Sequence, residues 1–389
     1  MTGIAGGAGG AGVTGSEGAP GEVLVGVEEE FLLLDADTAR PAPRITEILP
    51  DAARTAGENA QPELHRAQIE IATEPCRTLG ALRAELTRLR VQVVEAARRS
   101  NTLVVAAGTY PGQMGPPGRL VTPEPRYEQI ARDASVLGAE QLICGCHVHV
   151  SVAPERAVPA MNRVRRWLPV VLALSANSPF WEGQDTGFSS FRTEVWVRWP
   201  TAGPIGGFAS MAEYEALLDR LVATGVILDR AMAYWDVRPS QRFPTLEVRV
   251  ADVMPSTDEV VAVAGVIRAL VVWAAEGRGG PEADRPLRPE LQRAASWRAA
   301  RAGLGEELID PLLGTAAPAS AAVAQLVELL GPTMEELGDR LELVGLVARL
   351  LERGNGADRQ RRAFRRRHAL GDVVGALTLD AGGEPPGTA

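Results

Sequence analysis

Glutamate and histidine residues occupy alternating positions in four segments that have the pattern of β-strands. The residues are Glu28 and Glu30 in 23–34, Glu70 in 67–72, His147 and His149 in 143–152, and Glu247 in 245–250. Alternate residues of a strand point to the same face, so each segment presents one polar face and one largely apolar face. We therefore predict that these side chains lie together on the polar face of one sheet.

Carboxylates at this spacing are suited to binding hard divalent cations. Glu28 and Glu30 would lie roughly 7 Å apart, where two carboxylates repel by about 2–3 kcal/mol at an effective dielectric constant of about 20. Divalent ions remove that repulsion. Mg²⁺ or Mn²⁺ prefers carboxylate oxygens with an occasional imidazole to an all-histidine or thiolate shell. The pattern therefore favours a magnesium or manganese site over a zinc site.

Each motif alone also has a structural explanation. A single Glu-x-Glu is usually a solvated strand face, and a His-x-His pair fits a packed core as well as a site. Glu247 and Arg249 two residues apart are commonly part of a cross-strand ion pair. The coincidence of all these motifs on matching faces favours one site. Glu29 points to the opposite face, and the sequence leaves its environment unexplained.

The basic residues of the chain restrict how it could bind a nucleotide. All 40 positions counted as lysine or arginine are arginine. A Walker P-loop and a kinase-type phosphate site are excluded, because each requires a lysine ammonium on the phosphates. If the protein uses ATP, arginines and metal ions must bind the phosphates.

Helices and strands must alternate to position these residues. Apolar residues at spacings of three and four predict helices over 77–99, 124–138, 156–175, 211–232, 257–276, 319–330 and 334–353. One more strand is predicted over 234–238, where Asp236 and Arg238 share a face. We expect a sheet with helices on its apolar side and a charged, concave opposite side.

Composition indicates one catalytic domain between two tails. Residues 1–21 and 379–389 offer little to bury, so we expect both to be disordered. Residues 22–378 form the expected single catalytic domain. Its C-terminal helical portion begins at about residue 288, within the Pro-, Gly- and charge-rich connection 279–292.

The overall composition argues against several classes of protein. The formal charge of −9 provides no basic stripe for nucleic acid, and we interpret the local run 361–368 as a solvated helix face. No stretch approaches 18 uninterrupted apolar residues, and the start lacks the features of a secretory signal, so no membrane association and a cytoplasmic location are expected. Three cysteines without a Cys-x-x-Cys pair indicate reduced thiols, and we assign Cys144 and Cys146 a packing role.

Eight segments in the correct order resemble the glutamate–cysteine ligase type 2, or carboxylate–amine ligase, family. They are G-V-E-E-E-F at 26–31, Q-I-E-I-A-T-E-P at 68–75, C-G-C-H-V-H-V at 144–150, L-S-A-N-S-P-F-W at 174–181, F-R-T-E-V-W-V-R-W-P at 191–200, Y-W-D-V-R-P-S at 234–240, T-L-E-V-R-V at 245–250 and G-N-G-A-D-R-Q at 354–360. The resemblance runs from about 22 to 375. It implies an α+β, glutamine-synthetase-like catalytic fold with a curved, largely antiparallel sheet, helices on its outer face, and ATP with two or three Mg²⁺ ions on its polar face.

The resemblance also implies roles for individual residues. The positions that match metal ligands are Glu28, Glu30, Glu70, His147 and Glu247, with Glu63 as a weaker sixth candidate. His149 and Arg249 would approach the ATP phosphates, and Arg238 would serve the transferring phosphoryl group. Arg192 is our hypothesis for the glutamate carboxylate, although a surface ion pair would explain either Arg192 or Arg238. The run of Asn355, Arg359 and Gln360 matches a family motif that could equally be a helix start.

The implied activity is ATP-dependent joining of the γ-carboxylate of L-glutamate to the amine of L-cysteine through γ-glutamyl phosphate. The expected partners are small molecules, and a homodimer is compatible with the sequence. Three alternatives stay open: a ligase for a different amine, a metal-dependent hydrolase in which the histidines and acids activate water, and a binding protein that retains the fold with little turnover. The arginines favour phosphate and carboxylate binding over hydrolysis.

Overall fold

The computed structural model describes residues 22–114, 120–280 and 288–386. Its main element is a seven-stranded, fully antiparallel sheet in the order β2-β3-β1-β5-β9-β8, with β4 paired to the far half of β1. The strands are β1 (Val25–Asp35), β2 (Ala60–Pro62), β3 (Gln68–Ala72), β4 (Thr102–Val105), β5 (Gly145–Ser151), β8 (Val237–Pro239) and β9 (Thr245–Asp252). Two-stranded ribbons are formed by β6 (Phe180–Trp181) with β7 (Gln184–Asp185), and by β10 (Glu307–Ile309) with β11 (Ala316–Pro318).

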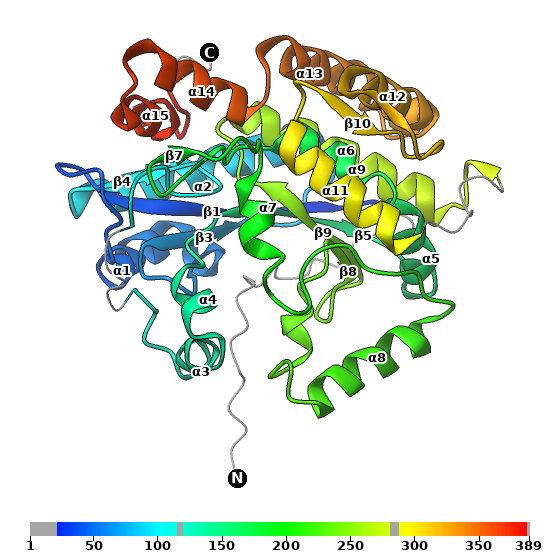
Figure 1. Cartoon of the computed structure of the whole chain (residues 1–389), viewed down its shortest axis with the longest axis horizontal. Helices are drawn as coiled ribbons and strands as arrows, with labels where there is room; N and C mark the ends of the chain where they lie inside the picture. The colour runs from blue at the N-terminus through cyan, green and yellow to red at the C-terminus, as the bar shows by residue number, and fades with distance from the viewer. Residues whose placement is uncertain (1–21, 115–119, 281–287, 387–389) are drawn as a thin grey trace.

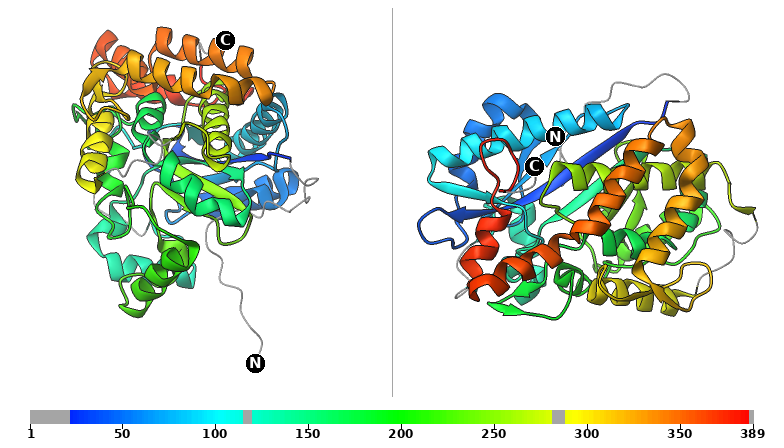
Figure 2. Two further views of the ribbon diagram at one scale, coloured as in Figure 1. Left: turned by 90° about the vertical axis from the view of Figure 1, so that its right-hand side faces the viewer. Right: turned by 90° about the horizontal axis from the view of Figure 1, so that it is seen from above.

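Helices cover the apolar face of this sheet in two layers (Figure 1). The inner helices α2 (Leu79–Arg99), α6 (Leu168–Ser175) and α9 (Thr257–Ala275) pack on the strands, and α1 (Ile45–Ala56) packs beside α2. Nearly every residue of α9 is buried, because α12 (Ala319–Glu336) and α13 (Arg340–Arg353) cover its outer side. Figure 2 shows α12 and α13 with α14 (Gly356–Arg367) and α15 (Leu370–Leu377) as the outermost layer.

The polar face of the sheet is flanked rather than covered. In Figure 1, α3 (Pro125–Ala134), α4 (Val136–Ala139) and α8 (Met211–Ala223) lie on the side opposite α12 and α13. A separate apolar cluster, which includes Tyr127, Ile130 and Trp199, joins α3 to the segment around η2 (Arg230–Met232). Together with α7 (Phe191–Trp196), these elements form the walls of a cleft over the sheet.

The structure confirms the predicted antiparallel sheet with helices on one face, and it changes several element boundaries. The predicted helix 156–175 is two helices, α5 (Pro154–Val164) and α6, because Pro169 in the first turn of α6 has no amide hydrogen to continue the preceding helix. The predicted helix 211–232 ends at Ala223, where Gly225 adopts a φ of +72°. Helix α12 runs six residues beyond its predicted end at 330.

The C-terminal end of the described residues packs on the domain. The tail expected at 1–21 lies outside the described residues, as do 281–287 of the expected connection. Residues 379–386 pack on the domain instead of forming the tail expected there: the Leu379 amide donates to Val104 O at 2.9 Å, and the Glu384 carboxylate accepts from the Thr257 amide at 3.0 Å. Within the described residues, no helix has the length and apolar character needed to span a membrane.

Candidate active site

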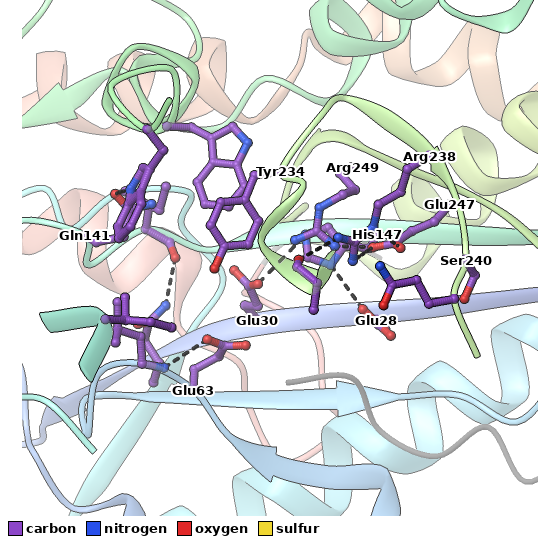
Figure 3. A pocket seen from close by; sticks show the side chains of 18 of the residues that line it. Glu28, Glu30, Glu63, Gln141, His147, Tyr234, Arg238, Ser240, Glu247 and Arg249 are labelled. Atoms are coloured by element: carbon purple, nitrogen blue, oxygen red, sulfur yellow. Dashed lines mark hydrogen bonds and ion pairs between the residues drawn. The ribbon is translucent and has the colours of Figure 1, made fainter. Parts of the chain in front are cut away.

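The register of the strands brings the predicted residues together in adjacent cross-strand rows of the sheet. Glu28 on β1 pairs with His147 on β5, and Glu30 pairs with Glu70 on β3. On the other side of β5, His149 pairs with Glu247 on β9, which in turn pairs with Arg238 on β8. All seven lie on the polar face, and all except Glu70 line a cleft with a volume of about 180 Å³. Figure 3 shows most of them converging in this cleft.

One group of potential metal ligands is formed by Glu28, His149 and Glu247, which offer ligand atoms within 4.8 Å of one another. His149 Nε2 lies 3.3 Å from Glu28 Oε1. Burial alone would raise the pKa of Glu28, but the neighbouring His149 and His147 outweigh it and lower the pKa. Glu28 is therefore a carboxylate at neutral pH and can bind a cation.

A second group consists of three carboxylates, from Glu30, Glu63 and Glu70, again with oxygens within 4.8 Å of one another. Burial, reinforced by the charge of Glu30, raises the pKa of Glu63 to about 7. Burial and the same neighbours raise the pKa of Glu70 well above its usual value, and Glu70 Oε1 has no hydrogen-bond partner among the described residues. Buried and partly buried acidic groups at this separation repel one another, and a bound cation would remove this repulsion. Glu63, the weaker candidate, thus belongs to this group.

His147 lies between the two groups. Its Nδ1 is 3.1 Å from Glu28 Oε2, and its Nε2 is 3.8 Å from Glu30 Oε1. Burial, with the charge of Arg249, lowers the pKa of His147, so the ring is neutral at pH 7. The geometry therefore puts His149, which was predicted at the phosphates, inside a three-ligand group, whereas His147 bridges two carboxylates.

The arginines on β8 and β9 are paired with Glu247. Arg238 binds it through two hydrogen bonds of 2.7 and 3.1 Å, and Arg249 Nη1 contacts the same carboxylate. Burial would raise the pKa of Glu247, but Arg238 and Arg249 hold this pKa well below its usual value. Two guanidinium groups therefore face the cleft beside the first metal-ligand group, where they could meet anionic oxygens.

Arg192 extends from α7 into the cleft between Gly145 and Trp196. A Cβ atom on Gly145 would clash with its guanidinium, so a larger residue at this position on β5 would displace Arg192. The Trp196 ring centroid lies 5.9 Å from the guanidinium carbon of Arg192 and 5.9 Å from that of Arg249. Arg192 is thus a buried residue of the cleft. Its Nη2 donates to Arg249 O at 3.5 Å, and its ion-pair distance of 3.8 Å to Asp252 is too long for a hydrogen bond.

Several residues that line the cleft are not marked by strand parity. The cleft is also lined by Tyr127, Gln141, Trp196 and Tyr234. They come from helices and loops, where no two-residue alternation marks them. The sequence signals for Tyr234 and Trp196 are the segments Y-W-D-V-R-P-S and F-R-T-E-V-W, in which aromatic residues lie beside the charged ones.

The Asn355–Gln360 segment is a helix start, as one of its two interpretations stated. The Asn355 side chain accepts from the Asp358 amide, and the Asp358 carboxylate accepts in return from the Asn355 amide, which forms a capping box on α14. Gln360 binds Asn177, and Arg359 Nη2 contacts Glu259 Oε2 of α9 at 2.6 Å. The segment therefore fixes the outer helical layer to the core.

The three cysteines are free and buried, which agrees with the packing role predicted for Cys144 and Cys146. Burial raises the pKa of both thiols well above the usual value. Neither thiol is a nucleophile at neutral pH.

A model of the glutamate–cysteine ligase family 2 matches residues 24–377. A candidate glutamate–cysteine ligase 2-2 of Frankia alni is 44% identical over 365 residues, which cover 90% of this chain and 94% of that protein. A candidate glutamate–cysteine ligase 2 of Rhodopirellula baltica is 39% identical over 356 residues, which cover 90% and 95%.

Two crystal structures resemble most of the chain at low sequence identity. A bifunctional glutathione synthetase from Pasteurella multocida matches with a TM-score of 0.67 and 17% identity, over 91% of this chain and 51% of that one. This chain thus spans about half the length of that protein. A glutamate–cysteine ligase from Francisella tularensis in complex with AMP matches with a TM-score of 0.61 and 12% identity, over 91% and 87%. These likenesses confirm the expected glutamine-synthetase-like fold.

Proposed function

Since this chain belongs to the glutamate–cysteine ligase family 2, we propose that it joins the γ-carboxylate of L-glutamate to an amine in a reaction driven by ATP, with L-cysteine as the first acceptor to test. The observation that supports this most is the arrangement, in and beside one cleft, of two groups of metal ligands and the guanidinium groups of Arg192, Arg238 and Arg249. A hydrolase that activates water with one metal ion would not need three guanidinium groups beside it.

The residues present fit divalent cations. One ion would be held by Glu28, His149 and Glu247, and a second by Glu30, Glu63 and Glu70. The donors are mostly carboxylate oxygens, and the second group is short of positive charge, both of which suit Mg²⁺ or Mn²⁺. Such ions would neutralise phosphate oxygens and so reduce the barrier to nucleophilic attack at phosphorus.

The arginines have distinct roles in this proposal. Arg238 and Arg249, beside Glu247, stabilise the phosphate oxygens of ATP and the negative charge that develops during phosphoryl transfer. Arg192, which extends into the cleft from α7, binds a carboxylate of glutamate and orients the γ-carboxylate toward the nucleotide. Because no lysine is present, guanidinium groups supply all the fixed side-chain cations.

The reaction proceeds in two displacements. An oxygen of the glutamate γ-carboxylate attacks the γ-phosphorus of ATP, the bond to the β-phosphate oxygen breaks, and ADP leaves with γ-glutamyl phosphate formed. The amine nitrogen then attacks the γ-carbonyl carbon, the C–O bond to phosphate breaks, and the amine releases a proton as the amide forms. No protein nucleophile is required, which agrees with the buried, protonated cysteines.

An ADP-release assay with Mg²⁺, followed by mass spectrometry of the product, tests this function. We expect ADP release to require both glutamate and an amine, and the product to contain one new amide bond. Glu247→Gln should abolish it, whereas Glu155→Gln, at an exposed position of α5, should not. ATP hydrolysis without an amino acid, or nucleotide binding without any product across a broad panel of amines, would contradict the proposal.

A further inference from the structure

Arg192 is held in place by a carboxylate that lies outside both groups of metal ligands. Arg192 Nη1 is 3.8 Å from Asp252 Oδ1, which is too long for a hydrogen bond but close enough for strong attraction between buried charges. Asp252 is fully buried and Arg192 is 3% exposed. Arg192 Nε has no hydrogen-bond partner among the described residues. The guanidinium is thus attracted to Asp252 while it keeps donors for a ligand.

Asp252 is itself fixed by three hydrogen bonds. Ser178 Oγ donates to it at 2.7 Å, Ser190 Oγ at 2.8 Å and the Asn177 amide at 2.8 Å. Ser190 is the N-cap of α7, and the Arg192 amide donates to Ser178 Oγ at 3.0 Å. One carboxylate therefore binds the N-cap of the Arg192 helix and lies beside the Arg192 guanidinium, which also donates from Nη2 to Arg249 O at 3.5 Å.

Strand parity alone would not place Asp252 beside this site. The pairing of β5 with β9 shifts register between Cys146 and Val148, where β9 has one extra residue. The shift turns Asp252 to face the segment 177–192 instead of the opposite side of the sheet. The bulge is therefore what brings this carboxylate to Arg192.

The network continues to the outer helical layer through Asn177. Gln360 Nε2 donates to both the backbone and side-chain oxygens of Asn177 at 2.8 Å. Asn177 Nδ2 donates in turn to Ala106 O and Val253 O, both at 2.8 Å. Gly356 lies so close that a Cβ atom there would clash with the Asn177 side chain. The start of α14 thus holds the segment that binds Asp252.

We propose that Asp252 is a positioning residue for Arg192, and that Gln360 supports it through Asn177, so that the guanidinium is presented to the carboxylate of the donor amino acid. The inference rests on the proposed function, because it assigns the ligand of Arg192 as glutamate. It also gives the Asn355–Gln360 segment a functional consequence beyond capping a helix. Asp252 touches no substrate and acts only through Arg192.

Kinetics of Asp252→Asn separate positioning from a general structural role. We expect KM for glutamate to rise by about tenfold or more, while KM for ATP changes by less than about twofold. In an Arg192→Gln background, Asp252→Asn should raise KM for glutamate by less than a further factor of about two, because the guanidinium that Asp252 positions is absent. Asp310→Asn is the matched control: Asp310 is buried and accepts two backbone amides, but lies outside the cleft. It should leave both KM values unchanged.

Milder variants keep the test decisive if Asp252→Asn does not fold. Ser190→Ala removes one hydrogen bond to Asp252, and Gln360→Glu removes the donor to Asn177. Both should raise KM for glutamate and not KM for ATP, whereas Ser210→Ala, which removes the equivalent cap of α8, should change neither. A folded variant with an unchanged KM for glutamate, or an equal effect in the Arg192→Gln background, would overturn the inference.

Crystal structures distinguish failure of this inference from failure of the proposed function. If the wild-type protein releases no ADP in response to glutamate, the proposed function fails. Crystal structures of the wild type and Asp252→Asn then decide the positioning claim by themselves. A displaced Arg192 guanidinium in the variant supports the claim, and an unmoved one overturns it.

Discussion

Glu29 and Arg90 form a fully buried ion pair on the apolar side of the sheet. Arg90 Nη2 lies 2.6 Å from Glu29 Oε1, Arg90 Nε lies 2.9 Å from Glu29 Oε2, and both side chains are 0% exposed. Arg90 also donates to the carbonyl oxygens of Met254 and Pro255. This pairing accounts for the one glutamate of the Glu-Glu-Glu run that points away from the cleft.

Breaking this pair should destabilise the protein strongly. We expect Arg90→Met to lower the free energy of unfolding by about 3–5 kcal/mol, because it leaves a buried carboxylate without a cation. The double variant Glu29→Leu with Arg90→Met should recover much of that loss, since no buried charge remains. Urea unfolding measures both, with Arg88→Met, at an exposed arginine of the same helix, as the control. A double variant no more stable than Arg90→Met would contradict this account.

Removing one carboxylate of the second group should weaken metal binding without harming the fold. Glu70→Gln keeps the shape of the side chain but removes a charge from three neighbouring acids. We expect the metal-free variant to be at least as stable as the wild type. Its Mg²⁺ affinity should fall by about tenfold or more, so saturating Mg²⁺ would stabilise it by about 1.4 kcal/mol less.

Thermal unfolding with and without Mg²⁺ measures both quantities for Glu70→Gln. Glu58→Gln, an exposed glutamate just before β2, is the control and should respond to Mg²⁺ as the wild type does. Equal stabilisation of Glu70→Gln and the wild type by Mg²⁺ would remove Glu70 from the metal-binding group.

Stability should depend on pH through Asp236. Burial raises the pKa of Asp236 to about 7, and the opposing effect of Arg192 is smaller. Between about pH 4 and pH 7 the folded protein therefore retains a proton that the unfolded chain releases, so this group makes stability fall as pH rises. The free energy of unfolding of Asp236→Asn should exceed that of the wild type by an amount that grows by about 2–4 kcal/mol between pH 4 and pH 7. Above pH 7 this difference should stay constant. Unfolding free energies of both proteins from pH 4 to pH 8 test this, and a constant difference would refute it.

Gly145 should be essential for the position of Arg192. In Gly145→Ala the new methyl group would occupy the space of the guanidinium. We expect KM for glutamate to rise by about tenfold, with a small change in KM for ATP. Gly206→Ala is the control, because a Cβ atom there meets no atom within 4 Å. Wild-type kinetics in Gly145→Ala would show that Arg192 can move without consequence.

Strand parity was sufficient to predict that these charged residues share one face of the sheet. In an antiparallel sheet, residues paired on neighbouring strands point to the same face, so the alternation along each strand matches that of its neighbours. Glu28, Glu30, Glu70, His147 and Glu247 all lie on the predicted face. Parity could not separate His147 from His149. Both side chains point to the polar face of the sheet. They differ in their strand partners, because His147 pairs with Glu28 and His149 pairs with Glu247.

Other features depend on contacts that the local pattern does not contain. Asp252 reaches Arg192 because of a bulge in β9, and a bulge breaks the alternation on which parity relies. The Arg90 partner of Glu29 had a detectable signal. Arg90 lies four residues after Leu86 and three before Val93, on the buried face of α2, where an arginine requires a partner.

The central claim is that two groups of side chains hold divalent cations beside a nucleoside triphosphate. Anomalous diffraction from crystals grown with Mn²⁺ and a non-hydrolysable ATP analogue tests it directly. We predict one peak among Glu28, His149 and Glu247 and a second among Glu30, Glu63 and Glu70, with phosphate density toward Arg238 and Arg249. Nucleotide density in the cleft with no Mn²⁺ peak at either group would contradict the account.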